Sequence, residues 1–289
     1  MRDVTEASIT DTFMGYLGPD VDPRLREVLG SLVSHLHAFA RETRLTHEEW
    51  SRGLEFLRAC GRITTAQRDE FVLLSDVLGL SSLVDAMHSP ESGTSSSVLG
   101  PFHISDPPRL PMGSDLRGDA GGELVLVTGR VLDAAGAPIG GATLDIWQTA
   151  PNGLYSSQDE AQDEYSFHAL FETGDDGAYR FTTTRPVPYT VPTDGPVGEI
   201  LDASGRHPWR PSHLHYIVAA EGFRSLVTEV FPDDDPYLDE DTVFGVREDL
   251  VIRYRSQPPE AFPASGFALS GRVDEPFSRV DFDVVLGAA

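Results

Sequence analysis

The spacing of apolar positions is helical in the first third of the chain. Between residues 23 and 89 apolar side chains recur every three or four positions, which predicts helices separated by short turns. Capping boxes at Thr46–Glu49 and Thr64–Gln67 predict where two of these helices begin. The clearest apolar stripe comprises Leu25, Val28, Leu29, Leu32, Val33 and Leu36.

Beyond residue 124 the apolar spacing changes to every second position, which is typical of strands. A stretch rich in Ser, Gly and Pro, residues 90–122, separates the two patterns and predicts an ordered linker arm. Glycine-containing turns divide the second region into short strands. The predicted strands are Leu124–Leu132, Thr143–Trp147, Tyr179–Thr184, Leu214–Ala219, Leu226–Phe231, Leu250–Tyr254 and Val280–Val285.

This arrangement predicts a mainly β protein with two regions. Residues 1–120 form an N-terminal helical segment and linker arm, and residues 121–289 form an antiparallel β-sandwich. The two ranges bury different kinds of apolar surface, because one is patterned for helices and the other for strands.

Composition and charge narrow the function classes. The formal net charge of −24 disfavours binding to nucleic acid or to an anionic membrane surface. The single cysteine, Cys60, excludes an intrachain disulfide and a cysteine-based metal site, and its apolar surroundings predict burial. Residues 1–18 lack the basic start and apolar run of a signal peptide, so a cytoplasmic location is expected.

Candidate metal chemistry lies in the segment 207–215, which ends in His213 and His215. Histidines two positions apart on a strand point to the same face and can share one metal ion, although such a pair also fits an ordinary strand. Tyr155 follows a predicted strand and Tyr189 lies in a proline-flanked loop. Each tyrosine, taken alone, fits a packed aromatic residue better than a metal ligand.

The chain resembles the intradiol dioxygenase family in segments that match it in order and spacing. The likeness extends over most of the chain, so it carries more weight than an isolated His-x-His pair. The matching segments are LVTGRVLDAAGAPIGGATLDIWQTAPNGLY at 126–155, YRFTTTRPVPYTVPTDGPVGEIL at 179–201 and GRHPWRPSHLH at 205–215.

The resemblance implies one iron(III) per subunit, held by Tyr155, Tyr189, His213 and His215. Phenolates are hard anionic donors that favour the ferric state, so this donor set suits the implied metal. The resemblance also places Arg210 over the substrate ring, where a fixed cation would stabilise developing negative charge.

The implied reaction is insertion of O2 between the two hydroxyl-bearing carbons of an aromatic diol, which opens the ring to a muconate. The diol binds as a dianion, and the displaced Tyr189 takes up a substrate proton. The resemblance further implies a homodimer formed through the N-terminal helices, with a lipid in an apolar tunnel beside them. No organic cofactor is implied.

Within this family the chain is most similar to enzymes that cleave hydroxyquinol (benzene-1,2,4-triol) to 3-hydroxy-cis,cis-muconate, the enol form of maleylacetate. The similarity lies in VLGPFHI at 98–104, HPWRP at 207–211 and DPYLDEDTVFGVREDLVI at 235–252. The positions that match the ring pocket, together with Arg210, are Leu73, Asp76, Val98, Leu99, Gly100, Pro101, Phe102, Val191 and Pro192.

Two carboxylates bear on the choice of substrate. Asp76 in the pocket wall would accept a hydrogen bond from a third ring hydroxyl, although it also fits a solvated helix residue. Glu229 stands where catechol enzymes tend to carry glutamine. Because a carboxylate would add negative charge beside the substrate, Glu229 is expected to be protonated or turned away.

Three alternatives remain at this point. The same iron site serves catechol and chlorocatechol 1,2-dioxygenases, which differ in the ring they accept. A β-sandwich with this pattern also fits a metal-free carbohydrate- or protein-binding module. A third alternative is a hydrolytic zinc site, which would consume no oxygen.

Overall fold

The computed structural model describes residues 3–89, 92–118, 120–263, 266–269 and 273–289. The chain forms two compact units, Met1–Arg58 and Ala59–Ala289. The division at residue 120 predicted from the sequence stays a prediction about where helices give way to strands. Parts of the predicted linker, residues 90, 91 and 119, lie outside the described residues.

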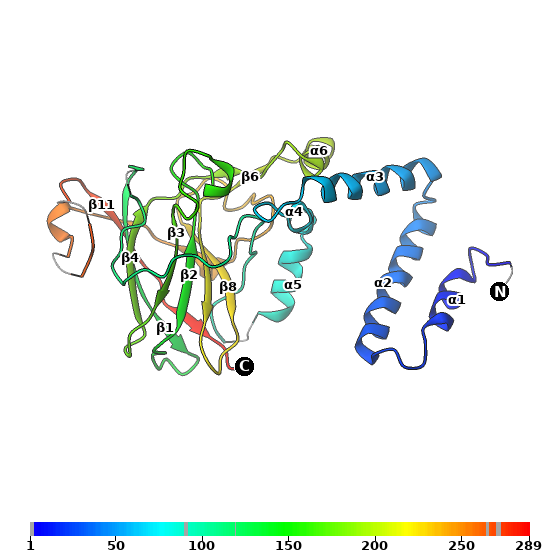
Figure 1. Cartoon of the computed structure of the whole chain (residues 1–289), viewed down its shortest axis with the longest axis horizontal. Coiled ribbons are helices and arrows are strands. Elements are labelled where there is room, and N and C mark those ends of the chain that lie inside the picture. The colour runs from blue at the N-terminus through cyan, green and yellow to red at the C-terminus, as the bar shows by residue number, and fades with distance from the viewer. Residues whose placement is uncertain (1–2, 90–91, 119, 264–265, 270–272) are drawn as a thin grey trace. The chain divides into compact units, whose positions relative to one another are not determined.

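The predicted helical region is confirmed as the helices α2 to α5. Two shorter helices, α1 and α6, were not predicted; α6 begins with a proline in its first turn and packs against α4 within the second unit (Figure 1). The helices are α1 Ile9–Tyr16, α2 Pro23–Glu42, α3 His47–Ile63, α4 Glu70–Val77, α5 Leu80–His88 and α6 Pro196–Ala203. Short 3-10 turns lie at Ser156–Gln158, Glu248–Leu250 and Pro259–Ala261.

One of the two predicted capping boxes forms. In Thr46–Glu49 the backbone N–H and the hydroxyl of the threonine donate to the glutamate carboxylate, each at 2.8 Å. The box predicted at Thr64–Gln67 is wrong, because this threonine donates its hydroxyl to the carbonyl of Cys60 at the end of α3. Asp69 caps α4 instead by accepting two backbone N–H groups of its first turn.

The first sheet of the sandwich is mixed rather than purely antiparallel. β4 pairs antiparallel with β1, whereas β11 and β12 both pair parallel with β1. Its strands are β1 Leu124–Asp133, β4 Ala178–Thr184, β10 Arg255–Gln257, β11 Phe277–Asp281 and β12 Val284–Leu286. The predicted single strand Val280–Val285 is therefore wrong at its centre.

The break between β11 and β12 has a local cause at Gly129. A Cβ on this glycine would lie 1.8 Å from the carbonyl oxygen of Phe282, so the chain passes too close for any side chain. At the same place the carboxylate of Asp283 accepts the backbone N–H of Arg130 at 2.8 Å. The C-terminal segment leaves the ladder at residues 282 and 283 and resumes its pairing with β1, in the same register, as a second strand.

The second sheet carries its strands in the order β3-β2-β7-β8-β9. The predicted strand Leu250–Tyr254 is wrong at both ends, because residues 248–250 form a 3-10 turn and only two residues pair with β8. The strands are β2 Thr143–Trp147, β3 His168–Glu172, β7 Leu214–Ala219, β8 Leu226–Pro232 and β9 Val251–Ile252. A separate two-stranded ribbon joins β5 Tyr189–Thr190 and β6 Trp209–Arg210.

The two faces of the second sheet have different environments. Leu144 and Ile146 of β2 point into the apolar core between the sheets, so the alternating Asp145 and Trp147 lie on the outer face. The arm of residues 92–118 covers this outer face and pairs its backbone with the sheet, for example through Leu110 N and the carbonyl of Leu170 at 2.9 Å. The covered outer face can therefore hold buried polar groups apart from the core.

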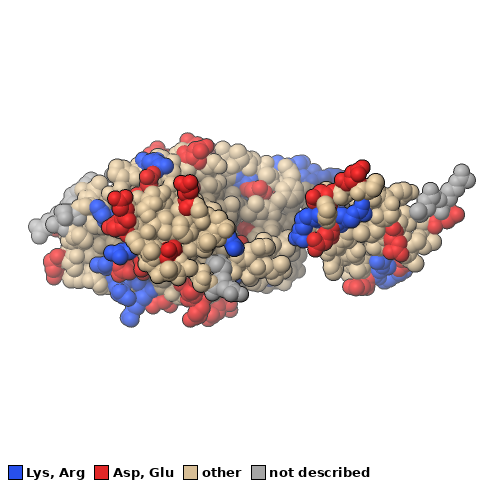
Figure 2. Space-filling model, turned by 90° about the horizontal axis from the view of Figure 1, so that it is seen from below, with Lys and Arg blue, Asp and Glu red and all other residues tan. Residues whose placement is uncertain are grey.

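The surface carries charges of both signs. On the face shown in Figure 2, small groups of Arg lie beside Asp and Glu. Within the described residues no single helix is long and apolar enough to cross a membrane. The helices α4 and α5 taken together reach the required length and apolar composition, but the chain bends by 74° between them.

Candidate active site

A row of side chains crosses the outer face of the second sheet. The strand register places His168, Trp147, His215 and Glu229 opposite one another on β3, β2, β7 and β8. The rings of Trp147 and His215 stack with centroids 4.5 Å apart and planes only 2° from parallel. The sheet thereby fixes the orientation of one histidine that the sequence singled out.

Four predicted donor atoms converge beside this row. The hydroxyl oxygen of Tyr155 lies 2.9 Å from Nε2 of His215, 3.4 Å from Nε2 of His213 and 3.2 Å from the hydroxyl oxygen of Tyr189. Nε2 of His213 lies 3.1 Å from that of His215 and 3.5 Å from the Tyr189 hydroxyl. All four side chains are buried. The structure therefore brings together residues that are up to 60 positions apart.

These distances match a cage for one metal ion. Four ligand atoms held about 2.0–2.1 Å from a metal in a tetrahedral arrangement lie about 3.3 Å from one another. Nδ1 of His213 lies 2.7 Å from the carbonyl oxygen of Pro211, which can only accept, so the ring proton sits on Nδ1. The lone pair of Nε2 is consequently directed toward the other donors.

Burial sets the protonation of the four groups. It lowers the pKa of His213 and His215 well below the ordinary value, and the nearby Arg210 guanidinium adds to this effect, so both imidazoles are neutral. Burial raises the pKa of the Tyr155 phenol well above its ordinary value, and it raises that of Tyr189 as well. Neutral imidazoles are the form that binds metals, and a bound cation would replace the phenol protons.

A buried ion network holds Arg210 beside the four donors. Its NH1 lies 3.2 Å from Nε2 of His213. The guanidinium donates two bonds to Glu229, at 2.8 and 3.0 Å, and two to Asp241, at 3.1 and 3.2 Å. Ser97 also donates its hydroxyl to Glu229, at 2.6 Å. Two carboxylates thus fix the position of the single cation.

The expectation that Glu229 is protonated or turned away is wrong. Burial alone would raise the pKa of this carboxyl, but the Arg210 guanidinium lowers the pKa below its ordinary value, so Glu229 is ionised. One of its oxygens lies 3.4 Å from Nε2 of His213 and 3.3 Å from Nδ1 of His215. Both oxygens accept from Arg210, so the carboxylate balances that charge, and with His213 and His215 it also belongs to a group that could hold a metal ion.

Part of the predicted ring pocket gathers around one cavity. Phe102, Val191 and Pro192 line a cavity of about 380 Å³. The ring of Phe102 stacks on that of Tyr155 with centroids 5.1 Å apart, which connects the cavity wall to the converging donors. Pro101 is half-buried beside them.

The other predicted pocket positions differ in burial. A Cβ added at Gly100 would lie 3.5 Å from Cε1 of His215, so this glycine leaves room next to the histidine. Leu73 and Val98 are each 1% exposed, whereas Leu99 is 38% exposed. The assignment of all these positions to substrate binding stays a prediction.

Asp76 of α4 is the one acidic residue among the predicted pocket positions. It is 2% exposed, and its Oδ1 has no hydrogen-bond partner within the described part of the chain. Burial raises the pKa of this carboxyl to about 6. An ionised oxygen without a partner inside the protein is an acceptor available to a ligand hydroxyl.

Several contributors to the site were not assigned a role from the sequence. Asp241 and Ser97 reach Arg210 and Glu229 from distant loops; Asp241 lies within the matching segment 235–252 and Ser97 just before 98–104, but no local pattern predicts these contacts. Trp147 could have been assigned to the outer face from strand alternation, but its stacking on a histidine depends on the register of a strand 68 residues away.

Comparisons with known proteins agree with this geometry. Residues 105–288 match the family model described as "Dioxygenase", and residues 22–95 match "Catechol dioxygenase N terminus". The chain is 45% identical to a hydroxyquinol 1,2-dioxygenase from Rhizobium sp. (strain MTP-10005), over 92% of this chain and 90% of that protein.

Solved structures give the same result. The structure of hydroxyquinol 1,2-dioxygenase from Pseudomonas putida DLL-E4 superposes with a TM-score of 0.84 at 42% identity, covering 98% of this chain and 99% of that one. Catechol 1,2-dioxygenase from Pseudomonas arvilla C-1 has a TM-score of 0.81 at 26% identity, covering 98% and 91%.

The raised pKa of Asp76 predicts a pH-dependent effect of Asp76→Asn on stability. The folded state holds the Asp76 proton more tightly than the unfolded state, so the wild type loses stability as the pH rises from about 4 to about 6. Asparagine cannot ionise, so the variant should gain about 1 kcal/mol relative to the wild type between pH 5 and pH 8. Urea unfolding of both proteins at the two pH values measures this, and a difference independent of pH would contradict it.

Proposed function

Because this chain belongs to the intradiol dioxygenase family, we propose that it cleaves hydroxyquinol with O2 to 3-hydroxy-cis,cis-muconate, the enol form of maleylacetate. The observation that carries the proposal is the convergence of two phenol oxygens and two imidazole nitrogens, of which five pairs lie 2.9–3.5 Å apart. Catechol or chlorocatechol cleavage is the alternative, since these four donors do not depend on the substituents of the ring.

The metal we assign to this site is one iron(III) per chain, held by Tyr155, Tyr189, His213 and His215. The family uses iron, and a donor set with two phenolates favours the ferric state. When bound, this ion would draw electron density from a coordinated diol dianion and so activate the ring toward O2. The neutral state of both histidines supports the assignment, because a neutral imidazole already has one nitrogen with a free lone pair and need not lose a proton before it binds the ion.

The protein's own residues supply positioning and charge. Arg210 lies within 3.2 Å of His213 and is held from two sides by carboxylates, so its cation is preorganised where negative charge develops on the ring. The Tyr189 oxygen is the base we assign to one diol proton. Tyr189 and Arg210 face each other across the β5–β6 ribbon, which keeps base and cation in a fixed relation.

Asp76 supports the choice of a triol. Its buried Oδ1 has no partner within the described residues, and a third ring hydroxyl would supply the missing donor. Catechol has no such hydroxyl and would leave this carboxylate oxygen unsatisfied.

The N-terminal helices support a homodimer. On α2 five apolar side chains, spaced three or four residues apart, form one stripe, and each is 45–53% exposed. We propose that this stripe forms the contact with a second copy of the chain and that a lipid binds beside it. We also propose that the enzyme is cytoplasmic. Its members are Leu25, Val28, Leu32, Leu36 and Phe39.

Oxygen uptake with a panel of diols tests the proposed reaction. We expect kcat/KM for hydroxyquinol to exceed that for catechol by at least about tenfold, because only the triol satisfies Asp76. The ultraviolet spectrum of the product distinguishes hydroxymuconate from muconate. More efficient turnover of catechol would replace the proposal by its alternative, and no oxygen uptake with any diol would reject both.

The role of Asp76 in specificity is tested by Asp76→Asn. Loss of a charged hydrogen bond worth about 1.5–3 kcal/mol should lower kcat/KM for hydroxyquinol by about 10- to 150-fold and leave that for catechol nearly unchanged. Asp202→Asn, at an exposed position on α6, is the matched control. An equal loss of kcat/KM with both substrates would show that Asp76 does not bind the third hydroxyl.

Iron retention is tested by comparing two buried phenols. Tyr155→Phe removes one of the four converging oxygens, so the purified protein should lose most of its iron, its tyrosinate-to-iron absorption and its activity. Tyr179→Phe is the control, because the Tyr179 hydroxyl donates to the carbonyl of Phe282 in the sandwich core. This second variant should lose about 1 kcal/mol of stability and keep its iron. Full iron content in Tyr155→Phe would rule out that ligand.

A further inference from the structure

A second group of metal-binding side chains lies at the other end of the sheet row. His103, Asp145 and His168 each offer a donor atom, and these atoms lie within 4.8 Å of one another. Nε2 of His103 is 2.9 Å from Oδ2 of Asp145, and Nε2 of His168 is 2.7 Å from Oδ1. The two imidazoles therefore flank both oxygens of one carboxylate.

The three residues come from parts of the fold that are independently fixed. Asp145 and His168 project from the outer face of the adjacent strands β2 and β3. His103 belongs to the covering arm and packs edge-on against Trp147, with ring centroids 4.7 Å apart. Side chains held by a sheet and by a packed arm need little reorganisation to bind an ion.

The distances suit a bidentate carboxylate between two nitrogens. Zinc lies about 2.0–2.1 Å from imidazole nitrogen and about 2.0–2.2 Å from carboxylate oxygen. Ligand atoms at the tetrahedral angle around such an ion lie about 3.3 Å apart. The two nitrogen–oxygen separations, 2.9 and 2.7 Å, are shorter because they are those of hydrogen bonds. A bound ion would replace both Nε2 protons, with each ring then protonated on Nδ1, and would widen the separations by about 0.5 Å.

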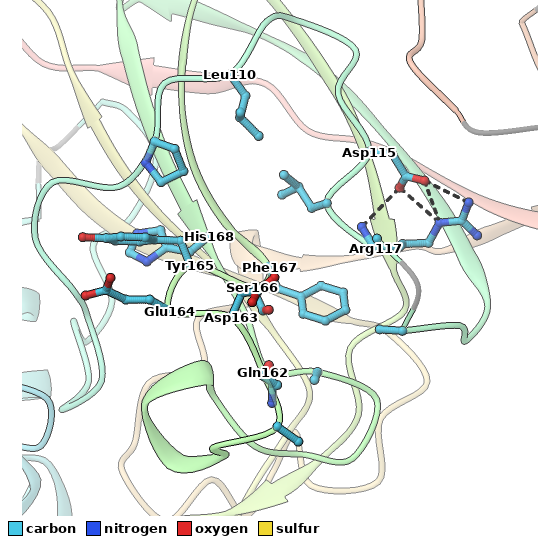
Figure 3. Close-up of a pocket in the computed structure, with 16 residues that line it drawn as sticks. Leu110, Asp115, Arg117, Gln162, Asp163, Glu164, Tyr165, Ser166, Phe167 and His168 are labelled. Carbon is cyan, nitrogen blue, oxygen red and sulfur yellow. Dashed lines mark hydrogen bonds and ion pairs between the residues drawn. The ribbon is translucent and has the colours of Figure 1, made fainter.

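The charge and access of the group also suit a cation. The hydrogen bonds from the two histidines outweigh the effect of burial and lower the pKa of Asp145, so this carboxylate is ionised. The side chains of His103 and Asp145 are 18% and 13% exposed. His168 lines a cavity of about 820 Å³ and lies beside Tyr165 at its wall (Figure 3). The cavity therefore borders the group at His168.

We propose that His103, Asp145 and His168 form a second metal site that binds one divalent transition-metal ion, with Zn²⁺ the best match to its donors. This site is separate from the four donors around Tyr155 and requires no iron. Bound metal would tie the arm at His103 to the sheet, and the neighbouring Phe102 stacks on Tyr155. The expected consequence is a more stable pocket wall.

Calorimetric titration of the iron-loaded enzyme with Zn²⁺ tests the proposal. We expect one ion bound per chain, with unchanged iron absorption. His168→Gln and Asp145→Asn should each weaken this binding by at least about tenfold. The control is His207→Gln, which alters an exposed histidine that lies 3.7 Å from Glu240 and should bind Zn²⁺ like the wild type. Equal binding by all variants, or no binding by the wild type, would overturn the proposal.

A second measurement covers variants that fail to fold. Wild-type crystals soaked in Zn²⁺ should give an anomalous peak between the two Nε2 atoms and the carboxylate of Asp145; the absence of a peak there overturns the proposal. Failure of the proposed iron chemistry would look different. Zn²⁺ would then bind among the four donors around Tyr155, and that binding would be lost in Tyr155→Phe and kept in His168→Gln.

Discussion

The register of the second sheet is the constraint on which the rest of the site depends. Pairing of β2, β7 and β8 places Trp147, His215 and Glu229 side by side on one face. A shift of one residue would turn this row into the apolar core, because neighbouring side chains on a strand point to opposite faces. The core residues Leu144 and Ile146 oppose such a shift, so packing of the sandwich also maintains the site.

Charge balance is the second requirement of this buried region. Burying an unpaired guanidinium beside two imidazoles would cost free energy of folding. Glu229 and Asp241 offset this cost, because they accept hydrogen bonds from Arg210 on two sides. The same cation lowers the pKa of His213 and so favours a neutral ring. The ion network thus offsets the cost of burying Arg210 and keeps the donors in the form that binds a metal.

Much of the site was accessible from the sequence, and the reason differs between residues. His213 and His215 lie on the same face because successive side chains of a strand point to opposite faces, and this rule can be applied to the sequence alone. Tyr155 and Tyr189 were linked to them only through resemblance to a family, and the structure brings their oxygens together. Glu229 was misjudged, because its charge depends on an arginine 19 positions away that becomes its partner only in the folded chain.

The sequence by itself determined the kinds of element and the sandwich class, because periodicity and turns are local properties of a chain. It named the four donors only through segments that resemble a family. Only the tertiary structure decided which strands pair parallel to β1, the partner of Glu229, and the meeting of His103 with Asp145 and His168. These outcomes depend on contacts between segments far apart in the chain. Such contacts are selected by packing and register, and the residues around each position do not encode them.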